Sequence, residues 1–122
     1  MTIEQCYEKL GGDFQRVCCR LPGRAFVERF MKRYLEDDSA QQLLSALRER
    51  NAEEAYRYAL ALKGVAGNLG FEDLERSAAE LEEAMRRSGG TVTPGVLMLA
   101  ENVRRRHTAA VKILRLYLED EK

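Results

Sequence analysis

The clearest helical pattern in this chain lies in residues 59–70, which read ALALKGVAGNLG. Apolar residues here and in the preceding turn recur at spacings of four, three, four and three, which is one buried stripe of an α-helix. The stripe consists of Ala55, Ala59, Leu62, Ala66 and Leu69. We therefore predict a helix that begins after Asn51, a capping residue, and ends at Gly70, where a left-handed backbone is needed.

Leu60 lies off this stripe, about 100° around the helix from Ala59. The face that it shares consists of Tyr56, Arg57, Lys63, Gly64 and Gly67. An apolar side chain is thus expected to point outward, beside a cation and two residues without a side chain. Each glycine inside a helix costs about 0.5–1 kcal/mol relative to alanine. Two glycines on one face predict close approach by another backbone, either within the fold or from a partner.

Six positions of this stretch match, in register, the signature of histidine-containing phosphotransfer (HPt) domains, roughly A-H-x-L-K-G-x-x-x-x-L-G. The matching residues are Ala59, Leu62, Lys63, Gly64, Leu69 and Gly70. The chain therefore resembles the HPt family, most closely over residues 52–85. Position 60, where the family carries its phosphoacceptor histidine, is leucine here. A leucine side chain has no lone pair and cannot form a phosphoramidate.

The resemblance implies a role in two-component phosphorelay signalling, with a response-regulator receiver domain or a sensor histidine kinase as partner. It also implies that Lys63 lies near the transferred phosphoryl group and that Gly64 leaves room for the receiver to dock. We expect no enzymatic activity and no cofactor. The predicted docking residues are Tyr56, Arg57, Leu60, Lys63, Gly64 and Gly67.

The rest of the chain also has helical spacing, and no strand pattern is visible. Helices are predicted over residues 2–10, 14–21 and 24–36, then from the capping residue Ser39, from Phe71 or Glu72, and from Pro94. The turns between them are short, as antiparallel neighbours require. The expected fold is a single domain of residues 1–122, an all-α antiparallel up-and-down four-helix bundle with short N-terminal helices.

Composition excludes several classes of function. Lysine plus arginine equals aspartate plus glutamate at 20 each, so the charge balance gives no global attraction to nucleic acid or an anionic membrane. No apolar run approaches the ~18 residues of a membrane span, and the N-terminus lacks a signal-peptide pattern, so a cytoplasmic location is predicted. The three cysteines lack C-x-x-C spacing, and no metal-binding motif is present.

His107 is the only histidine. It falls on the inward stripe of the last predicted helix, whereas a phosphoacceptor imidazole must be exposed to the donor. Ala110 and Val111 stand where the signature has lysine and glycine. We interpret His107 as a structural residue.

Three functions follow from these observations. The first is an HPt-like domain without its phosphoacceptor, which binds a receiver or kinase domain as an adaptor or decoy. The second is an active phosphotransfer protein in which leucine is an introduced substitution. The third is a structural or dimerising helical bundle, with Leu60 buried against another copy or another helix. The oligomeric state is not determined by the sequence.

Overall fold

The computed structural model describes residues 1–18 and 23–120, and every regular element in these ranges is a helix. The helices are α1 (Ile3–Leu10), α2 (Phe14–Cys18), α3 (Arg24–Glu36), α4 (Ser39–Arg48), α5 (Ala52–Asn68), α6 (Glu72–Arg87) and α7 (Pro94–Asp120). The prediction of an all-α fold is confirmed. The predicted continuation of α2 to Leu21 lies outside the described residues.

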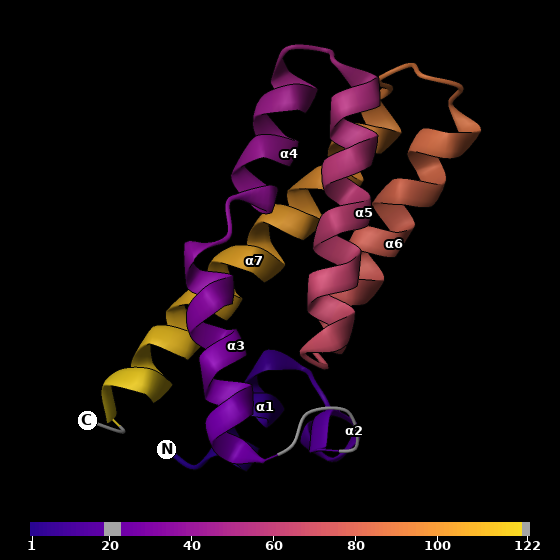
Figure 1. Cartoon of the computed structure of the whole chain (residues 1–122). Coiled ribbons are helices and arrows are strands. Elements are labelled where there is room, and N and C mark those ends of the chain that lie inside the picture. The colour runs from indigo at the N-terminus through magenta and orange to yellow at the C-terminus, as the bar shows by residue number, and fades with distance from the viewer. Residues whose placement is uncertain (19–22, 121–122) are drawn as a thin grey trace.

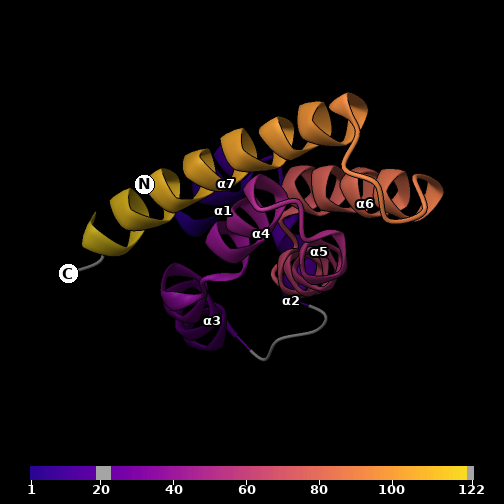
Figure 2. The same ribbon diagram turned by 90° about the horizontal axis from the view of Figure 1, so that it is seen from above.

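Helices α4, α5, α6 and α7 run side by side with alternating direction and form the bundle (Figure 1). Helix α3 precedes α4 and contacts the second half of α7, the longest helix, through the Arg24–Tyr117 and Tyr34–His107 hydrogen bonds. Seen from above, α6 and α7 are adjacent, with α4 and α5 beside them and α3 set apart (Figure 2). The predicted up-and-down bundle is therefore observed.

The core forms where the apolar stripes of the helices meet. On α5 the whole predicted stripe is buried, and it contains three alanines that allow neighbouring helices to approach closely. The stripe of α6 is buried opposite it and consists of Leu74, Ala78, Leu81 and Met85. This packing fixes the rotation of α5, so that residues off the stripe point outward or toward the edges of α4 and α6.

Side-chain caps set the helix starts. The Asn51 Oδ1 atom accepts a hydrogen bond from the Glu54 backbone N–H at 3.1 Å, and Thr93 Oγ1 accepts one from Val96 at the start of α7. Ser39 was predicted as a cap, but it is the first residue of α4. Its backbone N–H donates to Asp37 Oδ1 at 2.8 Å, so the carboxylate two residues earlier satisfies it.

The N-terminal helices close one end of the bundle through direct contacts with the backbone of the α5–α6 turn. Tyr7 Oη donates to the Leu69 carbonyl oxygen at 2.7 Å, and the Asp13 N–H donates to the Gly70 carbonyl oxygen at 3.1 Å. A Cβ atom at Gly12 would clash with that same Gly70 carbonyl oxygen. The glycine at position 12 is therefore required for the two turns to meet.

Candidate docking face on helix α5

Leu60 lies on the outer face of α5 with 39% of its surface exposed. Gly64 and Asn68 follow it at one-turn spacing on the same face and are exposed as well. Few large apolar side chains are so exposed in the described ranges: the others are Leu97, Met98 and Leu116, all on α7. The outward orientation that the sequence predicts for Leu60 is therefore observed.

The two glycines of the predicted face differ in their surroundings. A Cβ atom added at Gly64 would meet no heavy atom within 4 Å. A Cβ atom added at Gly67 would lie 2.6 Å from Glu75 Oε2, a carboxylate oxygen of α6, and Gly67 is buried. The close approach at Gly67 therefore occurs within the fold, and its predicted place on an exposed partner surface is corrected. Nothing in the described fold explains the glycine at position 64.

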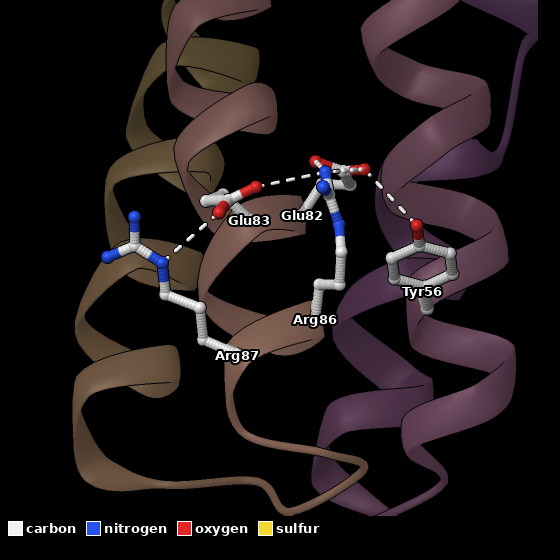
Figure 3. Close-up of polar contacts among 5 residues, drawn as sticks. All are labelled: Tyr56, Glu82, Glu83, Arg86 and Arg87. Atoms are coloured by element: carbon white, nitrogen blue, oxygen red, sulfur yellow. Dashed lines mark hydrogen bonds and ion pairs between the residues drawn. The ribbon is translucent and has the colours of Figure 1, made fainter.

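The edge of the face toward α6 is formed by a buried carboxylate with three hydrogen bonds (Figure 3). Glu82 is 5% exposed. Its Oε1 atom accepts from Tyr56 Oη at 3.2 Å, and its two carboxylate oxygens accept from Arg86 Nη2 at 2.8 and 3.0 Å. Arg86 also pairs with Glu83 at 2.9 Å. Tyr56 is thus held against α6 and frames one side of Leu60.

Burial alone would raise the pKa of Glu82. The hydrogen bonds from Arg86 and Tyr56 and the charges of Arg86 and Lys63 outweigh it, so the pKa lies below the ordinary glutamate value. The carboxylate is therefore ionised at neutral pH. Glu82 was not predicted as a site residue. Its position beside Leu81 and four residues before Arg86 is nevertheless the spacing of an ion pair next to a buried stripe.

Lys63 and Arg57 flank the face on opposite sides. Lys63 is half-buried on the side toward α6, and no carboxylate in the described ranges forms an ion pair with it. Arg57 is exposed, pairs with Glu54 at 3.5 Å, and lies 5.9 Å from the ring centroid of Tyr58. Of the predicted docking residues, all but Gly67 thus surround Leu60 on an accessible surface.

His107 lies away from this face, in a groove between α7 and the α3–α4 segment. It is half-buried, and its Nδ1 atom is 2.6 Å from Tyr34 Oη. Burial lowers the pKa of the imidazole, and the charge of Asp37 only partly offsets this. His107 and Leu60 are therefore not parts of one site.

Other site types have little support in the described part of the chain. No group of three or more histidine, cysteine, aspartate or glutamate side chains in residues 1–18 and 23–120 is placed to hold a metal ion. No helix in those ranges is both long and apolar enough to cross a bilayer. The basic residues 104–106 are each bonded within the fold: Arg104 to Glu101 and Arg105 to Asn102 on α7, and Arg106 to Asp73 on α6.

The sequence profile of the Hpt domain matches residues 29–117, from within α3 to near the end of α7. The chain belongs to the Hpt domain family. Hpt domains act in two-component phosphorelay signalling, where they carry phosphoryl groups and interact with receiver and kinase domains. Comparison with curated proteins and with solved structures gave no match. Helices α4, α5 and α6 and all but the last turn of α7 lie inside the matched region, whereas α1 and α2 lie outside it.

Proposed function

We propose that this Hpt domain binds a response-regulator receiver domain or a sensor histidine kinase without accepting a phosphoryl group. It would then act as an adaptor or as a competitive decoy. The resemblance places the family's phosphoacceptor at position 60, and Leu60 offers no nucleophilic atom there. A cytoplasmic location is a prediction that follows from such partners.

The proposal rests chiefly on the open surroundings of Gly64, a glycine inside α5. Glycine inside a helix costs about 0.5–1 kcal/mol relative to alanine, and a side chain at position 64 would meet nothing in the described fold. A bound partner that approaches α5 closely at this point accounts for a glycine that the fold does not need.

Contact with Leu60 would also contribute to the free energy of binding. Full burial of one leucine side chain contributes about 1.5–3 kcal/mol. A micromolar complex has a binding free energy of about 8 kcal/mol. Because Leu60 is already partly buried, covering its exposed 39% would supply about 1 kcal/mol of this, and neighbouring contacts would supply the rest.

The test is titration calorimetry of the chain against the receiver domains and sensor kinases of its own organism. We expect at least one of them to bind, and Gly64→Leu to weaken this complex by about tenfold or more through steric exclusion. Ala109→Leu is the matched control, since Ala109 is exposed on α7 and lies on another face. Circular dichroism establishes that both variants remain helical.

Two outcomes would contradict the proposal. The absence of any binding receiver or kinase would favour a structural bundle, especially if the chain forms a dimer that Gly64→Leu disrupts. Equal affinity of Gly64→Leu and the unmodified chain for a confirmed partner would exclude this face as the binding surface.

A further inference from the structure

We propose that the docking face extends from α5 onto α3 and receives an acidic segment of the partner, with an apolar side chain between the carboxylates. This inference rests on the proposed function, because it concerns the same partner on the same side of the molecule. It adds the chemistry of the partner segment and a second helix that recognises it.

The extension begins at a groove between α3 and α5 with a volume of about 200 Å³. Its lining includes Phe30, Arg33 and Tyr34 of α3 and Val65, Asn68 and Leu69 of α5. An apolar cavity of ~150 Å³ is large enough to hold benzene. The groove therefore accommodates one large apolar side chain, such as leucine or phenylalanine.

This groove is continuous with the exposed face around Leu60. Asn68 lines the groove and is exposed, and Gly64 lies one turn before it on the way to Leu60. Eight residues of helix correspond to about 12 Å. That span fits well within a standard protein interface of roughly 800 Å² per partner. One partner surface can thus cover Leu60, pass over the bare backbone at Gly64 and reach the groove.

Arg33 lines the groove, and Arg29 is exposed one helical turn before it on α3. The guanidinium carbon of Arg33 lies 5.2 Å from the ring centroid of Phe30, and that of Arg29 lies 5.7 Å from the ring centroid of Phe26. Neither forms an ion pair with a carboxylate in residues 1–18 and 23–120, although most other described arginines do. The paired arginines are Arg16, Arg24, Arg57, Arg76, Arg86, Arg87, Arg104 and Arg106.

The chemistry of these two arginines indicates which groups the partner segment carries. A guanidinium packed against an aromatic ring presents its N–H donors in the plane of the guanidinium group. This arrangement matches the two oxygens of a carboxylate. The acidic group that lines the groove, Asp37, already accepts a hydrogen bond from the Ser39 N–H at 2.8 Å. Two cations beside one apolar groove therefore fit carboxylates that flank an apolar side chain, whereas a nucleic-acid backbone would need a longer basic track.

The experiment is calorimetric titration of charge-reversed variants against the receiver or kinase domain that binds the unmodified chain. Arg29→Glu and Arg33→Glu place like charges opposite the partner's carboxylates. We expect each to weaken binding by about tenfold or more. Arg105→Glu is the control, because Arg105 is also exposed but lies on α7, and we expect its affinity to stay within about twofold. The salt dependence of the affinity should fall in both α3 variants and persist in the control.

The outcomes separate this inference from the proposed function. If Gly64→Leu weakens binding but both α3 variants bind as tightly as the unmodified chain, the extension is overturned and the docking face on α5 stands. If the control loses as much affinity as the α3 variants, the effect is a general one of net charge and the extension is also overturned. If no receiver or kinase binds, or Gly64→Leu has no effect, the proposed function fails and the extension fails with it. Melting temperatures near that of the unmodified chain show that the variants are folded.

Discussion

Leu60 and Leu62 are two residues apart on α5 but have opposite environments, since Leu62 is 1% exposed and Leu60 is 39% exposed. We predict that Leu60→Ala changes the free energy of unfolding by no more than about 0.5 kcal/mol, as is usual for a surface position. The matched change Leu62→Ala should cost about 2–5 kcal/mol, as for a core leucine. Urea unfolding of the two variants measures both values.

The change in unfolding free energy of Leu60→Ala also distinguishes a docking role of this leucine from a structural role. A loss of about 2 kcal/mol or more for Leu60→Ala in the monomer would mean that Leu60 is packed inside the fold. That result would contradict the exposed docking face and favour a structural role for this leucine.

His107 gives a second prediction at the scale of the residue. Its pKa in the folded chain lies below the ordinary value of 6.5, chiefly because of burial. Between the lowered pKa and 6.5 the unfolded chain binds more protons than the folded chain, so stability rises with pH in this window. The contribution of His107 to stability is therefore complete above about pH 6.5 and is lost as the pH falls through the window.

The measurement is urea unfolding of the unmodified chain and of His107→Gln at several pH values from about 7.5 down to 5. The stability difference between the two proteins should shrink on acidification, because only the unmodified chain loses the contribution of a neutral imidazole. A difference that does not change with pH would show that His107 titrates alike in the folded and unfolded chain.

At the scale of the elements, periodicity predicted most of what is observed. The stripes of α5 and α6, the caps Asn51 and Thr93, and the outward direction of Leu60 all follow from spacing, because a helix places every third or fourth residue on one face. Contacts between helices do not follow from spacing. Helical spacing assigned Gly67 to the docking face, which is wrong, because the packing of α6 brings the Glu75 carboxylate over it.

The groove between α3 and α5 also could not be predicted from helical spacing. Phe30 and Arg33 are visibly one turn apart in the sequence, but nothing in α3 alone shows that Asn68 lies opposite them. The N-cap of α4 is Asp38 rather than the predicted Ser39, and the Asp37 carboxylate accepts a hydrogen bond from the Ser39 N–H, the first of the helix.

The contact between the N-terminal turn and the α5–α6 turn gives a prediction for these elements. Gly12→Ala should destabilise the chain by about 1–3 kcal/mol, because the new Cβ atom would meet the Gly70 carbonyl oxygen, a backbone atom that cannot move aside alone. Gly95→Ala is the control, since its Cβ atom would make only an ordinary contact with Thr93 at 3.7 Å. Thermal unfolding compares the two variants.

This comparison also tests the prediction that residues 1–122 form a single domain. One cooperative transition that shifts to lower temperature in Gly12→Ala would support it. An unchanged main transition would mean that α1 and α2 attach to the bundle without contributing to its stability.

At the scale of the whole molecule, the packing leaves the Leu60 face open, with Lys63 and Gly64 of the motif beside it. We predict that Leu60→His acquires phosphoacceptor competence, because the imidazole would lie on the exposed face beside Lys63 and next to the unobstructed Gly64. Phosphoryl transfer depends mainly on positioning and on neutralisation of charge, which these residues can supply. The measurement is transfer from a phosphorylated receiver to the variant, with the unmodified chain as control. A variant that binds the receiver yet never gains phosphate would show that the retained motif serves the fold alone.

We propose above that this Hpt domain binds its partner and accepts no phosphoryl group. Native mass spectrometry of the unmodified chain with a phosphorylated receiver measures both the formation of a complex and the mass of the chain. We expect a complex of the two proteins in which the phosphoryl group stays on the receiver, and a free chain of unchanged mass. A chain that gains the mass of a phosphoryl group, or the absence of a complex with every receiver and kinase domain of the organism, would contradict this proposal.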